Sequence, residues 1–399
     1  MAGGAWHRAR VERLRATVEG HVAAGAVPGA AWLLARRGDV VAGTAGTVAE
    51  GGPPVARDTI FRISSLTKPV VAVAALILVE ECRLRLDDPV DALLPELAGR
   101  RVLVDPAGPA DGATEPAVRP VSLRDLLTFR LGLGMDFGHF GEQPVMDALA
   151  ALGLGAGPPR PQGPPEPDEW MRRFGTLPLA YQPGERWLYD TSADVLGVLV
   201  ARAAGRPLGA FLAERIFEPL GMADTGFSLP AATLGRFGPH YTTDPATGAR
   251  VEYDPAAGEW SSPPAFPSGA GGLVSTVDDL LAFGTMLRAG GVYQGRRILS
   301  RPTIEAMTTN QLTAAQMAAS GPDPGGALGW GFGVGVQVRR DGAWPSVGTC
   351  AWAGGLGSQW ANDPVEGLVG VVLTNLAWTS GPPALFPDFW TCAYAALDD

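Results

Sequence analysis

Lys68 is the residue best suited to chemistry, because it is the single lysine among the 31 lysine and arginine residues of this 399-residue chain. Arginine stays charged near neutral pH, whereas the pKa of a lysine can be lowered until it gives up its proton. Ser65 lies three residues earlier, and on a helix this spacing places both side chains on one face. The pair could therefore act as a nucleophile and its general base.

Pro69 indicates where the helix that carries this pair begins. Proline lacks an N–H and is tolerated in a helix only near its first turn, so we expect the helix to begin close to Ser65. Free N–H groups and partial positive charge at that end would stabilise negative charge on the oxygen of an attacked carbonyl. The alternative is an exposed lysine at a helix start that has no catalytic role.

Other catalytic chemistries lack their motifs. No serine is flanked as in G-x-S-x-G, no H-E-x-x-H occurs, and the single lysine is not preceded by the glycine of a nucleotide-binding loop. The histidines have no motif context: His7, His21, His139 and His240. The cysteines are odd in number and far apart, which favours neither disulfides nor a zinc site: Cys82, Cys350 and Cys392. We expect no metal and no cofactor.

The composition indicates a globular protein that binds small molecules. With 46% hydrophobic and 18% charged residues the chain can form a large core, and its length suggests two lobes. A net charge of −10 argues against nucleic acid or an anionic membrane as the partner. The longest apolar run, residues 70–79, is too short to span a bilayer. The arginine-rich N-terminal residues show no signal peptide, which together with reduced thiols predicts a cytoplasmic location.

Strand patterns near both chain ends surround a helical middle. Apolar spacing predicts a helix over residues 11–22, a hairpin over 29–34 and 40–43, and a strand over 59–62 that leads into Ser65. Further helices are expected at 121–129, 145–152, 193–204, 275–286 and 387–397, and loops at 105–120 and 153–168. Strands are expected at 332–338, 344–352, 358–361 and 368–374. One sheet is therefore built from both ends.

Three dispersed motifs resemble the serine β-lactamase and penicillin-binding-protein-like superfamily, in its class C-like branch, and most of all the family VIII carboxylesterases. They are Ser65-Leu66-Thr67-Lys68, Tyr189-Asp190-Thr191 and Trp352-Ala353-Gly354. The resemblance implies an α/β plus all-α fold, an antiparallel sheet flanked by helices with an inserted helical lobe. The α/β lobe would combine residues 1–80 and 320–399, and residues 81–319 would form the helical lobe with long loops.

The resemblance also implies roles for individual residues. Ser65 would be the nucleophile, Lys68 and Tyr189 would share the general-base work, and the N–H groups of Ser65 and Gly355 would form the oxyanion hole. Substrate would contact Trp352, Ala353, Gly354 and Thr191. For Tyr189 the alternative is a core tyrosine that packs beside Trp187.

Two departures from the family pattern bear on the substrate. Thr191 stands where the family often has asparagine, and Trp352 stands where β-lactamases have the lysine of Lys-Thr-Gly. The missing cation would pair with a substrate carboxylate, so its absence favours neutral acyl substrates. We therefore expect a serine hydrolase that cleaves small-molecule carboxylic esters through an acyl-enzyme.

Alternatives to ester hydrolysis remain at this stage. An acyltransferase would use the same acyl-enzyme and differ only in the acceptor. A β-lactamase or D-alanyl peptidase is disfavoured because the cation and an export signal are missing. A catalytically silent binding protein of the same fold is the non-enzymatic alternative. The oligomeric state stays open.

Overall fold

A seven-stranded antiparallel sheet built from both ends of the chain is the centre of the fold, with strand order β11-β12-β13-β14-β15-β1-β2. The computed structural model describes residues 5–138, 143–155, 157–323, 325–379 and 381–398. The sheet strands are β1 (Gly29–Arg36), β2 (Asp39–Gly46), β11 (Leu328–Trp330), β12 (Gly335–Gln337), β13 (Cys350–Gly354), β14 (Ser358–Asp363) and β15 (Leu368–Thr374).

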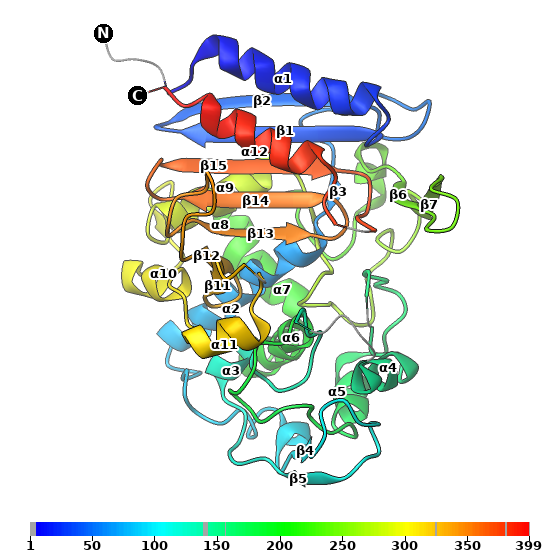
Figure 1. Cartoon of the computed structure of the whole chain (residues 1–399), viewed down its shortest axis with the longest axis vertical. Coiled ribbons are helices and arrows are strands. Elements are labelled where there is room, and N and C mark those ends of the chain that lie inside the picture. The colour runs from blue at the N-terminus through cyan, green and yellow to red at the C-terminus, as the bar shows by residue number, and fades with distance from the viewer. Residues whose placement is uncertain (1–4, 139–142, 156, 324, 380, 399) are drawn as a thin grey trace.

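Helices cover both faces of this sheet. The first and last helices, α1 (Arg8–Ala23) and α12 (Leu385–Ala395), contact each other and lie over the edge formed by β1, β2 and β15 (Figure 1). On the other face α9 (Val277–Arg288) packs against β15, β14 and β1. Along β1, Trp32 and Leu34 face α1 and α12, whereas Ala31 and Leu33 face the opposite core. Because both faces are buried, β1 and β15 are apolar up to their last residues, Arg36 and Thr374, and do not alternate.

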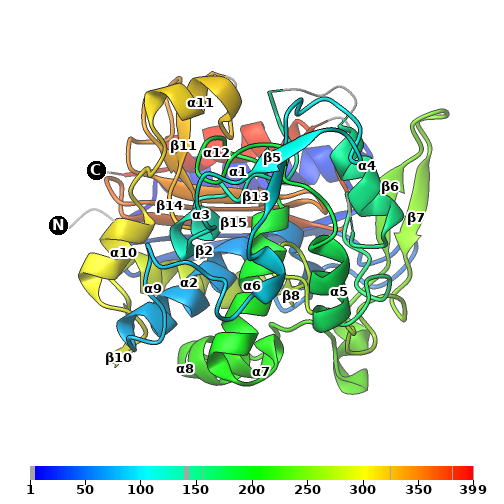
Figure 2. The ribbon, with the colours of Figure 1, turned by 90° about the horizontal axis from the view of Figure 1, so that it is seen from below.

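The helical part of the chain lies beneath the sheet. There α2 (Thr67–Glu80) contacts α6 (Thr191–Ala204), and Figure 2 shows the two side by side. The other helices are α3 (Leu123–Leu127), α4 (Pro144–Ala151), α5 (Pro167–Phe174), α7 (Leu208–Leu212), α8 (Glu218–Leu220), α10 (Arg301–Met307) and α11 (Ala314–Ser320). Among the described residues no single helix is long and apolar enough to cross a bilayer, although α6 and the bent continuation Leu208–Leu220 together meet those criteria.

Four short strand pairs lie outside the large sheet. They are β3 (Phe61–Arg62) with β8 (Val274–Ser275), β4 (Arg101–Leu103) with β5 (Thr114–Pro116), β6 (His240–Thr243) with β7 (Arg250–Asp254), and β9 (Val292–Tyr293) with β10 (Arg296–Arg297). The first of these pairs matters most for the site, because β3 leads directly into Ser65.

The fold class predicted from the sequence is confirmed: an antiparallel sheet from both chain ends, flanked by helices, with a helical part inserted. The lobe boundaries at residues 80 and 320 stay a prediction. The strand expected over 332–338 is too long, because β12 begins only at Gly335, after a tight turn from β11 in which Gly333 has a φ of 71°. The expected strand 344–352 is also too long, since β13 begins only at Cys350. The expected loop 105–120 contains β5.

Candidate active site

Ser65 lies in a turn of 3-10 helix, η1 (Ser64–Leu66), that continues directly into α2. Pro69 is the third residue of α2, where its missing N–H costs no helical hydrogen bond. The helix therefore begins close to Ser65, as predicted. Immediately before it, Ser64 has a φ of 38°, a left-handed conformation that residues other than glycine rarely adopt. The chain thus turns sharply as it enters the candidate nucleophile.

Lys68 makes the predicted contact with Ser65, since its Nζ lies 3.0 Å from Ser65 Oγ. The same Nζ donates to Asp190 Oδ1 at 2.6 Å and to the carbonyl oxygen of Ala270 at 2.6 Å. The Lys68 side chain has no exposed surface. Lys68 Nζ is thus surrounded by oxygen atoms from three different parts of the chain.

The neighbours of Lys68 stabilise its positive charge. Burial alone would lower the pKa of Lys68, but the negative charge of Asp190 and the contribution of Tyr189 outweigh it, and the pKa of Lys68 is raised above its ordinary value. The surroundings therefore favour the ammonium form. This differs from the expectation that Lys68 gives up its proton near neutral pH, an expectation that took no account of an adjacent carboxylate.

Tyr189 meets Lys68 and Trp352, so side chains from all three sequence motifs lie together. Lys68 Nζ lies 4.4 Å from the centre of the Tyr189 ring, and the indole N–H of Trp352 donates to the Tyr189 hydroxyl at 2.8 Å. An indole N–H can only donate, so the Tyr189 oxygen is the acceptor in this bond. The Tyr189 ring is also packed in an aromatic cluster with Phe129, Phe137, Trp187, Trp330 and Trp352. Tyr189 thus has a core-packing role and, through its hydroxyl, a polar one.

Gly354 brings the turn between β13 and β14 onto the backbone that precedes Ser65. A Cβ at Gly354 would lie 2.4 Å from the carbonyl oxygen of Ile63 and 2.5 Å from Ser64 Oγ, so only glycine fits. The contact is fixed by hydrogen bonds, from the N–H of Leu356 to Ser64 Oγ at 3.3 Å and from Ser358 Oγ to the carbonyl oxygen of Ile63 at 2.9 Å. The next residue, Gly355, is exposed, and within the described part of the chain its N–H has no partner.

The remaining predicted substrate-binding residues differ in exposure. Trp352 and Ala353 are half-buried, so part of each side chain is open to a bound molecule. Thr191 is buried at the start of α6, and its N–H donates to the carbonyl oxygen of Tyr189 at 3.2 Å. Contact between Thr191 and a substrate stays a prediction.

Asp190 and Asp194 are residues that motif spacing does not predict. Asp190 is the middle residue of the tyrosine motif, and its carboxylate reaches Lys68 only because its backbone has φ 82° and ψ −70°. Asp194 lies one helical turn further on, and its Oδ1 accepts hydrogen bonds from Ser268 Oγ at 2.7 Å and from the N–H of Ala270 at 3.1 Å. Burial and the nearby charge of Asp190 raise the pKa of Asp194 to about 7. The only feature of the sequence that points to this group of acids around Lys68 is Asp190, which directly follows the motif residue Tyr189.

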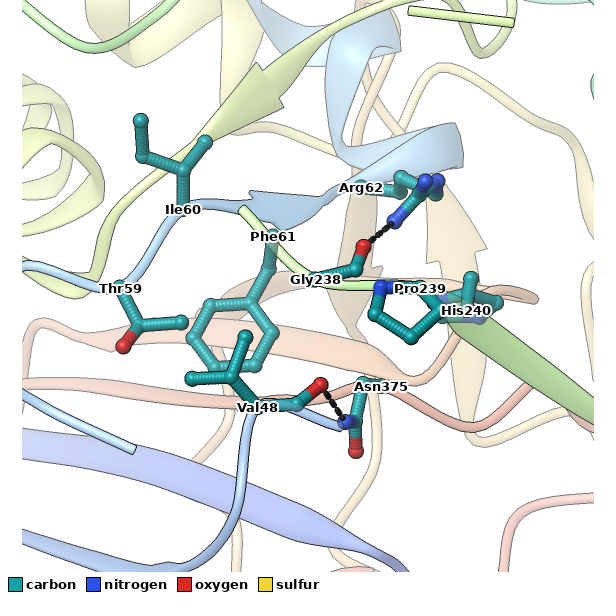
Figure 3. A pocket seen from close by; sticks show the side chains of 9 residues that line it. All are labelled: Val48, Thr59, Ile60, Phe61, Arg62, Gly238, Pro239, His240 and Asn375. Carbon is teal, nitrogen blue, oxygen red and sulfur yellow. Dashed lines mark hydrogen bonds between the residues drawn. The ribbon is translucent and has the colours of Figure 1, made fainter. Parts of the chain in front are cut away.

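Arg62 anchors β3, the short strand that leads into Ser65. It lines a cavity of about 10 Å³, the space of about one water molecule, together with Val48, Phe61, His240 and other residues (Figure 3). Its guanidinium forms a buried ion pair with Asp254 and donates to the carbonyl oxygen of Gly238 at 2.9 Å. The cavity is too small for a substrate. Its residues therefore support β3 and do not form a second binding site.

The histidines are not arranged for a serine–histidine pair among the described residues. His7 is exposed near the N-terminus, and His21 Nε2 lies 2.8 Å from Asp388 on the surface. Burial, together with the nearby charge of Arg62, lowers the pKa of His240 well below its ordinary value. His139 lies outside the described residues. Within the described part of the chain no group of three His, Cys, Asp or Glu side chains could hold a metal ion.

Comparisons with known proteins agree with this geometry. A family model described as Beta-lactamase matches residues 14–384. Among curated proteins, Protein Rv1367c of Mycobacterium tuberculosis is 38% identical over 327 residues, which are 80% of this chain and 78% of that protein. Esterase EstB of Burkholderia gladioli is 34% identical over 376 residues, 89% of this chain and 88% of that enzyme. Among solved structures, that of EstCE1, described as a hydrolase with promiscuous acyltransferase activity, superposes with a TM-score of 0.79 at 25% identity, covering 97% of this chain and 99% of that one.

Proposed function

The chain belongs to the Beta-lactamase family, and from this premise we propose that it is a serine hydrolase that cleaves carboxylic esters through an acyl-enzyme on Ser65. The observation that carries the proposal is the contact of Ser65 Oγ with Lys68 Nζ at 3.0 Å, with the Tyr189 ring against the same ammonium group. The 34% identity to an esterase along nearly the whole chain supports it.

The proposed reaction begins when Ser65 Oγ attacks the carbonyl carbon of the ester. The serine proton passes to the Lys68–Tyr189 pair, and the N–H groups of Ser65 and Gly355 stabilise the negative oxygen that forms. When the tetrahedral intermediate collapses, the C–O bond to the alcohol breaks, and the alcohol leaves with the proton that the pair received. Water then attacks the acyl-enzyme in the same way and releases the carboxylic acid.

Neutral esters are the proposed substrates. Where β-lactamases carry a lysine this chain has Trp352, whose indole N–H is used in the hydrogen bond to Tyr189. Lys68, the cation beside Ser65, is already paired with Asp190. A carboxylate on the substrate would therefore find no free positive charge at these residues. Hydrolysis of β-lactams and of D-alanyl peptides is accordingly disfavoured.

Acyl transfer is the second candidate function, because the relative EstCE1 is described as having promiscuous acyltransferase activity. The same acyl-enzyme would then be attacked by an alcohol instead of water. Adding an alcohol to the ester reaction distinguishes the two functions. A transferase yields the exchanged ester as the main product, and a hydrolase yields the free acid. A cytoplasmic location, with small molecules and not nucleic acid as partners, completes the proposal.

The test is to label the protein with a serine-reactive phosphonate and with p-nitrophenyl acyl esters, and to measure intact mass. We expect one adduct that peptide mapping places on Ser65 and that is absent in Ser65→Ala. The neighbouring Ser64→Ala is the matched control, because Ser64 Oγ accepts from the N–H of Leu356 and is not aimed at Lys68. An adduct elsewhere, or none, would contradict the proposal.

The proposed preference for neutral esters is tested by a separate measurement. Short-chain p-nitrophenyl esters should show a higher kcat/KM than nitrocefin or D-Ala-D-Ala peptides. Efficient penicillin hydrolysis with negligible esterase activity would overturn it.

A further inference from the structure

We propose that a cavity beside β4 is a second binding site, which takes a small organic carboxylate through Arg100. The cavity has a volume of about 300 Å³, and its charged and hydroxyl-bearing lining residues are Glu96, Arg100, Arg101, Thr114 and Thr176. None of its lining residues belongs to the candidate active site. Figure 1 shows β4 and β5 at the end of the molecule opposite α1 and α12. The inference goes beyond the proposed function and does not depend on it.

Arg100 is a buried cation for which the chain supplies no anion. Three arginines among the described residues are almost fully buried, Arg36, Arg62 and Arg100, with 3%, 2% and 6% of their surface exposed. Arg36 pairs with Glu366 and Arg62 with Asp254. Arg100 has no acidic partner in the described part of the chain, and burial alone lowers its pKa to about 10. A buried charge without a counter-charge is costly, and an anion bound from solution reduces that cost.

The guanidinium of Arg100 has hydrogen-bond donors that the protein does not use. Nη1 donates to the carbonyl oxygens of Phe174 at 3.4 Å and Gly175 at 2.8 Å, and Nη2 donates to that of Leu177. These bonds hold the turn that follows α5. The Nε–H has no acceptor among the described residues, and Nη2 carries a second hydrogen beyond the one bonded to Leu177.

Nε and Nη2 are the atoms with which other arginines of this structure hold a carboxylate. Arg57 uses them for both oxygens of Asp278, at 2.8 and 2.6 Å, and Arg124 uses them for both oxygens of Asp87, at 2.6 and 2.9 Å. Such two-point, charge-assisted hydrogen bonds are among the strong ones in proteins. A carboxylate, which is planar and has two acceptor oxygens, therefore matches the two hydrogens that remain on Arg100.

The other charged groups at the cavity also favour an anion. Arg101 is exposed on β4 and adds a second positive charge, while its Nε donates to Thr114 Oγ1 at 2.8 Å. Glu96 is the one acid among the described residues that line the cavity, and both of its oxygens accept from Arg202, at 2.9 and 2.8 Å. These hydrogen bonds lower the pKa of Glu96, and its charge is already balanced. The cavity is thus locally positive in a chain of net charge −10.

The size and lining of the cavity indicate an organic ligand. Pockets that bind small molecules begin at about 300 Å³, which is more room than one inorganic ion needs. Ala110, Leu177 and Pro178 are also part of the lining and can contact a short carbon chain. The alternative is that Arg100 only supports the carbonyl groups after α5, with water in the cavity.

Isothermal titration calorimetry with sodium butyrate tests the inference, with the ionic strength held constant by sodium chloride. We expect one saturable site in the wild-type protein at pH 7, where Arg100 is protonated. Lys68→Met should bind butyrate with the same affinity, because the cavity is separate from the candidate active site. Absence of saturable binding to the wild type would overturn the inference, and so would loss of binding in Lys68→Met.

Arg100→Lys tests the guanidinium directly. A lysine keeps the positive charge and can still donate to the carbonyl oxygens after α5, but it lacks the two-point edge of a guanidinium. We expect the affinity for butyrate to fall at least about tenfold, the size of one lost hydrogen bond to a charged group. Unchanged affinity in folded Arg100→Lys would contradict the assignment.

Ala98→Glu tests the site without changing Arg100, and so covers the case in which Arg100→Lys folds poorly. Ala98 is an exposed residue of the cavity lining, and a glutamate there brings a carboxylate that competes with the ligand. Ala98→Gln is the matched control of equal size, and it should bind butyrate more tightly than Ala98→Glu does. If Ala98→Glu binds no more weakly than Ala98→Gln, positive charge does not hold the ligand and the inference is wrong.

Thermal melting gives an independent readout. A ligand that binds only the folded state stabilises it, so butyrate should raise the Tm of the wild type more than that of Ala98→Glu. Equal shifts would reflect a general effect of the salt and would count against the site. Inorganic phosphate is the second probe, and saturable binding of phosphate without binding of butyrate would overturn the assignment of an organic carboxylate.

Discussion

At the scale of single residues, the site depends on a buried charge and the phenol beside it. Lys68→Met keeps the length of the side chain but removes the charge, and Tyr189→Phe removes only the hydroxyl that accepts from Trp352. Each should lower kcat/KM for p-nitrophenyl esters by about 10²-fold or more, the typical effect of losing a general base or its partner. Steady-state kinetics on protein that melts normally is the measurement.

The double variant of Lys68 and Tyr189 tests whether they act as a unit. Residues of one catalytic unit are strongly non-additive, so the double variant should cost little more than the worse single one. If instead the fold-losses in kcat/KM of the two single variants multiply in the double variant, the two residues have independent roles. Lys68→Arg should also be inactive, because a planar guanidinium cannot direct donors to the three acceptors that surround this buried ammonium.

The spacing of Ser65 and Lys68 was sufficient to predict their contact, because three residues on a helix always place two side chains together. The charge state of Lys68 could not be predicted in this way. It depends on Asp190 and Ala270, which are 122 and 202 residues away along the chain. Spacing within a motif therefore predicts a contact, and only the fold shows which proton each group holds.

At the scale of elements, the turn between β13 and β14 can lie against the residues that precede Ser65 only because Gly354 has no side chain. Gly354→Ala would place a Cβ within 2.5 Å of Ile63, Ser64 and Ser358, so the turn or the serine must move. We expect a loss of stability of about 1 to 3 kcal/mol, as for other overpacked sites, together with slower labelling of Ser65. Urea unfolding and phosphonate labelling are the measurements.

Gly355→Ala is the matched control for this turn, since a Cβ there meets no atom within 4 Å. Its stability should stay near that of the wild type. If Gly354→Ala were as stable as Gly355→Ala, the close approach of the turn to Ser64 would not be important for folding.

The first turn of α9 should make stability depend on pH through Asp279. Burial raises the pKa of Asp279 to about 6, although Thr225 and Asp224 donate hydrogen bonds to it. A folded pKa above the unfolded value of about 3.9 gives stability that is present below that value and lost as pH rises through 6. Asp279→Asn, which cannot ionise, should therefore become more stable relative to wild type between pH 4 and pH 8, by at most about 3 kcal/mol.

Asp278→Asn is the control for this effect, because Asp278 is the neighbouring acid, is 44% exposed and pairs with Arg57. Urea unfolding at the two pH values should show no comparable gain for it. Equal behaviour of the two variants would contradict the effect of burial at Asp279.

Elements with a strong local signal were predictable, and those set by tertiary contacts were not. The Thr276 hydroxyl caps α9 as its sequence indicates, accepting from the N–H of Asp279. By contrast, the alternation from Phe332 to Val338 indicates one strand, yet the N–H of Gly333 donates to the carbonyl oxygen of Leu127 and the chain reverses there. A partner so distant in sequence leaves no periodicity to recognise.

At the scale of the whole molecule, the site depends on contacts that bring together segments far apart in the sequence. Arg62 and Asp254 illustrate this, since they are 192 residues apart and form an ion pair in which both side chains are almost fully buried. Arg62 also lies over the rings of Phe237 and Trp260. Only Ile63 and Ser64 lie between Arg62 and Ser65, so the ion pair links the middle of the chain to the nucleophile turn.

Breaking this buried pair should therefore be costly. Arg62→Met leaves the Asp254 carboxylate buried without its cation, and we expect a loss of about 3 to 5 kcal/mol in the free energy of unfolding, measured with urea. The double variant Arg62→Met, Asp254→Asn removes both charges and should recover part of that loss. Arg57→Met is the matched control, because Arg57 and Asp278 also join distant segments but are about half exposed, and it should cost no more than about 1 kcal/mol. If Arg62→Met cost no more than Arg57→Met, the strand that leads into Ser65 would be held by its backbone pairing and apolar packing alone.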